Sequence, residues 1–349
     1  MTRVLVAGDH FVTPALVVDA LDRFTNLDIV THSGPWPHTP FGRVGEVDEA
    51  SDIEDELIDL LPGVEVVITQ MAPFTERVLA AAPTLKLIVV TRGGPVNVNL
   101  AAAKARGIEV RSTPGRNAAA AAEHTIALLL AALRMIPATH ASVLAGQWRS
   151  DLYALDAVGS ELGGATVGLV GFGAIGRRVA RILRAFDATV LVHDPYADPA
   201  ALDGAESVAL DELLSRSQVL SLHARLTAET RGMIGAKELA QLPHGAVLVN
   251  SARGGLLDYA AVAAALESGR LRAAAFDVFD VEPLPADSPL RTAPNAVLTP
   301  HLAGATVQTA RRAAEQAADA LAAWLTGATV PPAYVDVAPG ITTPNPGSR

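Results

Sequence analysis

The chain has 349 residues, half of them hydrophobic, a formal net charge of −10 and no cysteine. Its length is typical of about two domains of roughly 150 residues each. The acidic balance disfavours binding to nucleic acid or to anionic membranes. The lack of cysteine excludes disulfides, thiolate zinc sites, iron–sulfur clusters and a cysteine nucleophile.

The sequence shows neither the pattern of a signal peptide nor that of a membrane span. The N-terminal apolar stretch stops at Gly8-Asp9, too early for a signal peptide. The most apolar segment, 126–133, is shorter than the roughly 18 residues that span a bilayer. We therefore expect a cytoplasmic protein without membrane contact, and a flexible Pro- and Gly-containing tail over 336–349.

The first hundred residues alternate short aliphatic runs with helical patterns. Continuous apolar runs at 4–7, 64–69 and 85–91 predict buried parallel strands. Helical spacing follows at 52–61 and at 75–82. This alternation is typical of a βαβ domain.

An alanine-rich segment over 117–135 predicts a long helix, which Pro137 is expected to end. The stretch over 140–164, which contains Trp148 and Tyr153, is predicted to be irregular.

A second series of alternating elements follows. Apolar runs predict six strands, over Thr166–Val170, Thr189–His193, 219–223, Ala246–Asn250, 273–279 and 296–299. Helices are predicted over 175–186, 211–215, 259–268 and 305–325, and the last is expected to return to the first domain. The sequence therefore predicts an α/β protein whose second domain is a doubly wound dinucleotide fold.

A glycine motif lies between the first strand and helix of this second series. It reads Gly171-Phe172-Gly173-Ala174-Ile175-Gly176, the pattern G-x-G-x-x-G. The first glycine permits a tight turn, the second a close approach to a pyrophosphate, and the third close packing of helix on strand. Because the helix N-terminus offers unpaired N–H groups, the motif predicts a dinucleotide site.

Asp194 ends the next strand, at the distance where such folds place an acidic residue. A carboxylate there accepts hydrogen bonds from the ribose hydroxyls and repels a 2′-phosphate. This favours NAD over NADP. In the alternative interpretation, Asp194 only forms a turn with Pro195.

Three polar residues follow the carboxyl ends of later strands, where open α/β sheets bind ligands: Arg253, Glu282 and His301. A histidine can give or take a proton near neutral pH, and a carboxylate can orient it. An arginine can bind a substrate carboxylate. Alternatively, they are a surface charge, a turn acid before Pro283 and a structural histidine.

These segments resemble the D-isomer-specific 2-hydroxyacid dehydrogenase family. The resemblance rests on the glycine motif with Asp194 and on the stretches 221–230, 249–255, 276–283 and 299–304. It implies a Rossmann cofactor domain over 114–302, inserted into a flavodoxin-like substrate domain over 1–113 and 303–335. It also implies hydride transfer between NAD and C2 of a small D-2-hydroxy or 2-oxo acid.

The resemblance extends to further site residues. It assigns Thr113, Ala252 and Gly304 to the cofactor site, and Asp277 to the nicotinamide carboxamide. It assigns substrate binding to Arg92, Gly93, Gly94, Arg253 and His301. No metal site is expected.

Two positions depart from the family pattern. The segment 92–99 replaces the usual substrate loop, is shorter and lacks its aspartate, which leaves the choice of acid open among phosphoglycerate, glyoxylate or hydroxypyruvate, and sugar acids. Arg225 stands where the family commonly has proline, which weakens the argument against NADP.

The family also implies a homodimer formed through the helix over 117–135 and the arm after it, with Trp148 either reaching the partner's site or packing in the core. No C-terminal regulatory domain is expected. Within the enzymes, Glu282 argues against a formate-dehydrogenase-like activity, and phosphite oxidation stays open. The alternative from another class is an NAD(H)-sensing, corepressor-like binding protein on the same fold.

Overall fold

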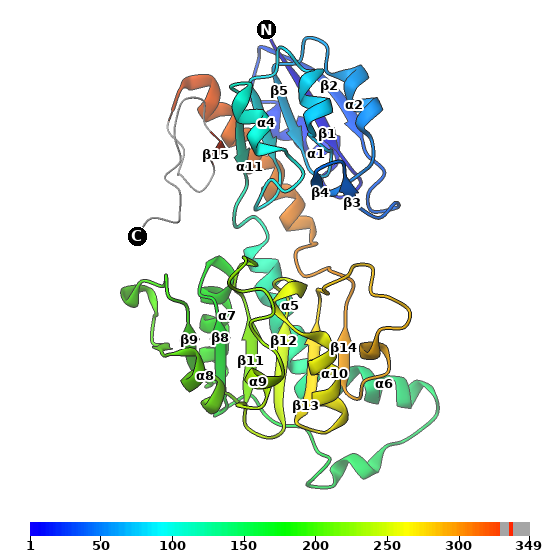
Figure 1. The fold of residues 1–349 in the computed structure, drawn as a ribbon, viewed down its shortest axis with the longest axis vertical. Coiled ribbons are helices and arrows are strands. Elements are labelled where there is room, and N and C mark those ends of the chain that lie inside the picture. The colour runs from blue at the N-terminus through cyan, green and yellow to red at the C-terminus, as the bar shows by residue number, and fades with distance from the viewer. Residues whose placement is uncertain (329–334, 338–349) are drawn as a thin grey trace. The chain divides into compact units, whose positions relative to one another are not determined.

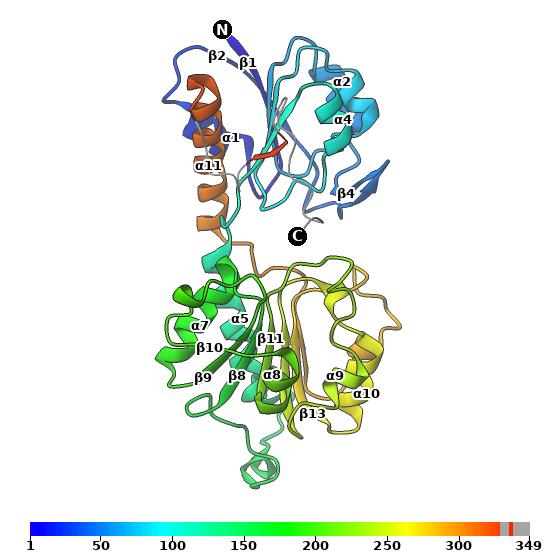
Figure 2. The same cartoon turned by 60° about the vertical axis from the view of Figure 1, so that its left-hand side comes forward.

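The structure is a computed structural model that describes residues 1–328 and 335–337. It divides into two units, drawn in Figures 1 and 2. Unit 1 comprises Met1–Asn117 and Ala305–Arg349, and unit 2 is the intervening segment Ala118–Gly304. The sequence placed the boundaries after residues 113 and 302. The tail predicted over 336–349 lies outside the described residues, apart from 336 and 337.

Unit 1 is built on a sheet with the strand order β15-β7-β6-β5-β1-β2, in which β15 alone is antiparallel. The parallel part has the flavodoxin-like order. The strands are β1 (Thr2–Gly8), β2 (Leu27–Ser33), β5 (Val66–Thr69), β6 (Leu87–Val90), β7 (Glu109–Ser112) and β15 (Val335–Val337), with a separate hairpin of β3 (Gly42–Val44) and β4 (Val47–Ala50). The helices are α1 (Pro14–Leu21), α2 (Glu54–Leu60), α3 (Glu76–Ala80), α4 (Leu100–Ala105) and α11 (Val307–Thr326).

Helix α11 belongs to unit 1 although it lies more than 180 residues beyond Asn117. Its face of alanines and Leu321 packs with α1 and with the side chains of β1 and β5 in one buried cluster. Figure 2 shows α11 beside α1. The predicted return of the last helix to the first domain is confirmed.

The sequence missed β2, β7 and β15 of this sheet, and the first two were missed because they contain polar residues. Strand β2 alternates exposed and partly buried positions at the sheet edge. Strand β7 reads Glu-Val-Arg-Ser, yet Arg111 is only 5% exposed. Its guanidinium donates to Glu109 Oε1 and, at 2.7 Å, to the carbonyl of Ala320 in α11. Pairing within the fold therefore compensates the burial of this charge.

Unit 2 holds a parallel sheet in the order β10-β9-β8-β11-β12-β13-β14. Numbered from β8, the order is 3-2-1-4-5-6-7, the Rossmann arrangement with one added strand. The strands are β8 (Thr166–Val170), β9 (Thr189–His193), β10 (Glu206–Ser207), β11 (Val219–Leu222), β12 (Ala246–Asn250), β13 (Leu271–Phe276) and β14 (Ala296–Leu298). The helices are α5 (Ala118–Leu133), α6 (Ile136–Leu144), α7 (Ala174–Ala185), α8 (Leu210–Arg216), α9 (Ala236–Leu239) and α10 (Tyr259–Glu267).

Two buried clusters cover the two faces of this sheet. One joins it to α5 and α7, and the other joins it to α8, α9 and α10. Figure 1 shows the helices in these two layers. Because both faces are covered, the strands are continuous apolar runs, which is why the sequence revealed them.

The segment after α5 corrects three predictions, the first of which is that Pro137 ends the α5 helix. Helix α5 ends at Leu133, Met135 turns with φ +52°, and Pro137 then lies in the first turn of α6. Proline suits that position because the first-turn N–H has no helical partner. The start of the stretch predicted to be irregular is therefore helical. Trp148 is 83% exposed, so its predicted core role is wrong.

Within the described residues, no single helix has the length and hydropathy of a bilayer span. Helices α5 and α6, bent by 64°, meet those criteria only when taken as a pair.

Candidate active site

The glycine motif forms the turn from β8 into α7. Gly171 has φ +98°, and a Cβ on Gly176 would lie 2.4 Å from the Gly171 carbonyl oxygen. Both positions thus require glycine, one for backbone conformation and one for packing.

The N-terminus of α7 is open. A Cβ built on Gly173, the N-cap residue, meets no atom within 4 Å, and no side chain caps the helix there. The amides of Ala174 and Ile175 lie in this first turn. An uncapped helix N-terminus beside open space suits a pyrophosphate, so the residues present fit a dinucleotide.

Asp194 faces this turn. Its Oδ2 accepts from the Phe172 N–H at 2.6 Å, and its Oδ1 accepts from the Tyr196 N–H at 2.9 Å. The carboxylate therefore holds the glycine turn and also forms the turn that the alternative interpretation proposed. Each oxygen retains a lone pair, so ribose recognition stays a prediction.

His301 and Glu282 form a direct pair. His301 Nδ1 lies 2.7 Å from Glu282 Oε2, and Glu282 Oε1 accepts from the Phe279 N–H at 2.9 Å. The imidazole is 34% and the carboxylate 23% exposed. Because Glu282 occupies Nδ1, the ring is fixed with Nε2 available, and Nε2 has no hydrogen-bond partner among the described residues.

The Arg253 loop packs directly against the Glu282 loop. A Cβ on Gly254 would lie 1.9 Å from the carbonyl carbon of Phe279, so only glycine allows this approach. Desolvation lowers the pKa of Arg253, while the charge of Glu282 acts in the opposite direction. The structure thus brings the three residues predicted from separate strand ends into one neighbourhood.

Asp277 is fully buried beneath this group. Its Oδ1 accepts from the Thr299 hydroxyl at 2.6 Å and from the Leu302 N–H at 2.8 Å, and its Oδ2 accepts from the Ala303 N–H at 2.7 Å. Burial raises the pKa of Asp277, but hydrogen bonds from His124, Thr299 and these amides outweigh it and hold the pKa below its usual range. The carboxylate is therefore ionised and supports the His301 loop, and its contact with a nicotinamide carboxamide stays a prediction.

Residues 126–303 match the family model of the D-isomer specific 2-hydroxyacid dehydrogenase, NAD binding domain. The chain belongs to this family. The family and fold predicted from the sequence are confirmed, and NAD is the cofactor that the matched domain indicates.

Curated relatives agree with this assignment. D-3-phosphoglycerate dehydrogenase of Mycobacterium bovis is 42% identical over 82% of this chain and 54% of its own length. The chain thus spans about half the length of that relative. Glyoxylate reductase of Thermofilum pendens is 39% identical over 74% of this chain and 77% of its own. The crystal structure of the TT0316 protein from Thermus thermophilus matches with a TM-score of 0.80 and 35% identity, over 96% of this chain and 100% of that one.

The three remaining residues predicted to bind the cofactor lie in loops, two in unit 2 and one in unit 1. Ala252 N–H donates to Asn250 Oδ1 at 3.0 Å, just before Arg253. Gly304 is the last residue of unit 2. Thr113, in unit 1, is buried, and its N–H donates to the Arg92 carbonyl at 2.7 Å. Their contacts with a cofactor stay predictions.

The predicted substrate loop follows β6 in unit 1. Arg92 is an ion-pair partner of Glu49, and its Nη1 donates to the Glu49 carbonyl at 3.1 Å. A Cβ on Gly93 or Gly94 would meet no atom within 4 Å. The two glycines thus leave an open backbone, whereas the Arg92 guanidinium already has a carboxylate partner. Substrate binding by these residues stays a prediction.

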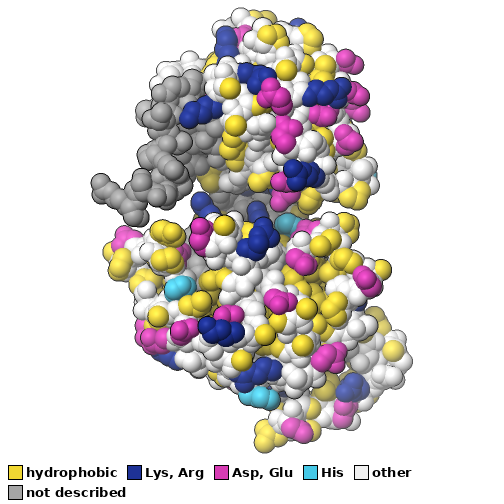
Figure 3. Space-filling view, in the orientation of Figure 1, with side chains coloured by type: hydrophobic (Ala, Val, Ile, Leu, Met, Phe, Trp, Pro, Cys, Tyr) yellow, Lys and Arg dark blue, Asp and Glu magenta, His cyan; other side chains and the backbone are white. Residues whose placement is uncertain are grey.

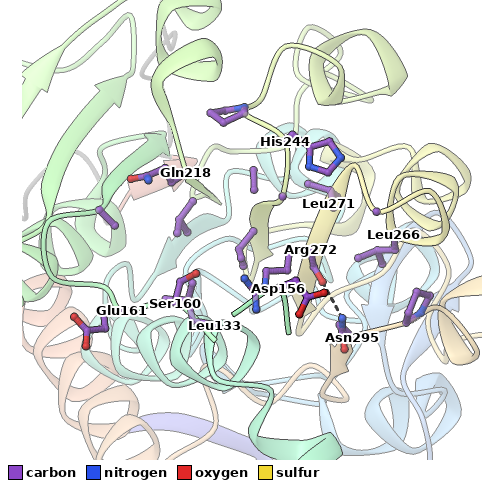
Figure 4. A pocket seen from close by; sticks show the side chains of 18 residues that line it. Leu133, Asp156, Ser160, Glu161, Gln218, His244, Leu266, Leu271, Arg272 and Asn295 are labelled. Atoms are coloured by element: carbon purple, nitrogen blue, oxygen red, sulfur yellow. Dashed lines mark hydrogen bonds between the residues drawn. The ribbon is translucent and has the colours of Figure 1, made fainter. Parts of the chain in front are cut away.

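A hollow of about 620 Å³ lies at the opposite edge of the unit 2 sheet (Figure 4). It is lined by residues at the amino ends of the strands, among them Val219, Ala246 and Leu271. The candidate catalytic residues follow the carboxyl ends, so this hollow is separate from their site.

Sequence reasoning missed His124. It lies on α5, with Nε2 3.1 Å from Thr299 Oγ1 and 3.4 Å from Asp277 Oδ1. The polar run Glu123-His124-Thr125 interrupts the alanine-rich helix, and this run was the available signal.

Proposed function

We propose that this protein is an NAD-dependent D-2-hydroxyacid dehydrogenase, which interconverts a small 2-oxo acid and the corresponding D-2-hydroxy acid. The observation that carries the proposal is the 2.7 Å pair of His301 and Glu282. Both residues lie in loops that follow strands of unit 2, the domain whose glycine turn fits a dinucleotide. Such a pair is the group that carbonyl reduction needs beside a hydride donor.

The proposed mechanism divides the reaction between the three side chains. NAD bound at the glycine turn would supply or accept the hydride. During reduction, His301 Nε2 gives its proton to the carbonyl oxygen on C2, the carbon that would accept the hydride. Glu282 stabilises the imidazolium before transfer and keeps Nδ1–H oriented afterwards. Arg253 binds the substrate carboxylate and polarises the carbonyl.

The relatives bear names of dehydrogenases and reductases, which does not favour the corepressor-like alternative. Their two activities, on D-3-phosphoglycerate and on glyoxylate, define the first substrates to test. We propose a small 2-hydroxy or 2-oxo acid as the substrate class.

The test is a spectrophotometric assay of NADH oxidation with glyoxylate, hydroxypyruvate, phosphohydroxypyruvate, pyruvate and sugar-derived 2-oxo acids. We expect turnover with at least one of them and a preference for NADH over NADPH. If none of the acids supports turnover while NADH binds, the proposed activity is wrong and a binding protein remains.

We also propose that the protein forms a homodimer through α5, α6 and the arm that follows. Helix α6 buries none of its residues, and Tyr153 and Leu155 of the arm are 88% and 92% exposed. Exposed aromatic and aliphatic side chains in one segment are typical of an interface. Light scattering coupled to gel filtration should give twice the chain mass, and Leu155→Glu should lower it; a monomeric wild type contradicts the proposal.

A nucleic-acid partner is not proposed. On the face drawn in Figure 3, acidic and basic side chains are interspersed on both units. Together with the net charge of −10, this does not favour phosphate backbones.

A further inference from the structure

His301 lies in a loop with an unusual backbone. Its φ is +56°, a left-handed conformation that residues with a Cβ seldom adopt. The His301 N–H donates to the Asp277 carbonyl at 2.8 Å, which anchors the loop to the end of β13. A strained backbone persists only where surrounding contacts hold it in place. Here such contacts matter because the imidazole reaches Glu282 from this conformation.

The carboxylate of Asp277 supplies these contacts. Its two oxygens accept from the amides of Leu302 and Ala303, the two residues directly after His301. The side chain is fully buried, so water does not compete for these bonds. The orientation of the Asp277 carboxylate therefore sets the path of the chain on the far side of His301.

His124 fixes that orientation from α5. The Thr299 hydroxyl donates its proton to Asp277 Oδ1, so its oxygen is free to accept. Nε2 of His124 lies within hydrogen-bond distance of this oxygen, at 3.1 Å. Because the Thr299 proton is directed to Asp277, the bond requires a proton on His124 Nε2. His124 and Thr299 thus form a chain of two donors that ends at the buried Asp277 carboxylate, and His124 Nε2 also lies 3.4 Å from Asp277 Oδ1 directly.

We propose that His124 is a positioning residue for the reaction proposed above: through Thr299 and Asp277 it holds the 299–303 loop so that His301 keeps its contact with Glu282. The effect of His124 on turnover rests on the proposed function, whereas its effect on the position of the His301 ring does not. The adjacent residue extends the role of the helix, because Thr125 shares a 2.6 Å hydrogen bond with Ser251, two residues before Arg253.

The experiment compares His124→Ala with His124→Gln and with His244→Ala in the full chain. Glutamine can place an N–H donor near the position of Nε2, and His244 is an exposed histidine of unit 2, outside the proposed dimer interface, that serves as the matched control. We expect His124→Ala to lower kcat for the best acid about tenfold to a hundredfold with a smaller change in KM. Glutamine should restore most of kcat, and the control should behave as wild type.

A second readout does not depend on activity. In protein labelled with ¹⁵N-histidine, the imidazole signals of His301, assigned with His301→Asn, should shift or broaden in His124→Ala and stay unchanged in His244→Ala. If the wild type turns over no acid, the proposed function fails, and these signals still decide the positioning role.

Thr299→Val provides a test if His124→Ala does not fold. It removes only the bridging hydroxyl and should reproduce both effects, whereas Thr299→Ser should not. Unchanged His301 signals in the folded His124 and Thr299 variants would overturn the proposal. So would a lowered melting temperature with kcat per folded molecule equal to that of wild type.

Discussion

The buried carboxylate of Asp9 in unit 1 gives a quantitative prediction for stability. Asp9 is 1% exposed; its Oδ1 accepts from the Phe11 and Val12 amides, and its Oδ2 has no hydrogen-bond partner within the described residues. Burial raises its pKa from 3.8 to about 6, although the two amides and Arg116 act in the opposite direction. Ionisation of Asp9 therefore costs more in the folded protein than in the unfolded chain.

The direction and size of the effect follow from this shift. Because the folded-state pKa lies above the unfolded one, the contribution of Asp9 is fully present below pH 3.8 and is lost as the pH rises through about 6. A rise of roughly two pKa units corresponds to about 3 kcal/mol, about half of which is lost by pH 5. Asp9→Asn removes this titration while keeping an acceptor for the amides of residues 11 and 12.

Urea unfolding between pH 4 and pH 7 measures the difference. The ring of Trp36 lies 6.0 Å from that of Phe11, so its fluorescence reports on unit 1 when Trp148 and Trp324 are replaced by phenylalanine in both proteins. Relative to Asp9→Asn, the free energy of unfolding of the parent should fall by about 2.4 kcal/mol over this range, because part of the loss has already occurred by pH 4. If the free energy of unfolding changed with pH in the same way for both proteins, the cost assigned to ionising the buried Asp9 carboxyl would be refuted.

Three further predictions concern the NAD-binding domain. His301→Asn should lower kcat about a thousandfold while NADH still binds with an affinity close to wild type, as measured by fluorescence titration; retained turnover would exclude His301 as the proton donor. Asp194→Ala should narrow the NAD/NADP preference in kcat/KM and lower the melting temperature, because the Phe172 amide loses its partner; an unchanged preference leaves only the turn role. Gly176→Ala should reduce stability by about 1–3 kcal/mol in urea unfolding because its Cβ meets a carbonyl oxygen, whereas Gly173→Ala should fold normally and weaken only NADH binding; equal stability of the two variants would contradict the packing argument.

The parts of the fold that could be predicted were those whose residues face protein on both sides. Strands β8, β9 and β12 carry continuous aliphatic runs, and their bounds were found from the sequence alone. Strand β7 could not be found this way because it buries Arg111 through pairs with Glu109 and α11, which lie two and about two hundred residues away. Long-range pairing of a buried charge leaves no local pattern.

The residues of the candidate site also divide into those that the sequence revealed and those that it did not. Arg253, Glu282 and His301 stand out because chemistry-bearing residues follow apolar strands. His124 does not, because its partners Thr299 and Asp277 become neighbours only after α5 packs on the sheet. Asp277 was assigned a cofactor contact, whereas the geometry adds a supporting role beneath the His301 loop.

The arrangement of unit 2 explains why such a site can be held by one helix. The three catalytic candidates follow β12, β13 and β14, which are adjacent and parallel, so their loops emerge side by side. Consecutive residues of α5, His124 and Thr125, bind the loops after β14 and β12 respectively. A shift of α5 along its axis would therefore displace His301 and Arg253 together. On this proposal, the pairing of His301 with Glu282 depends on α5 through the loop that carries His301.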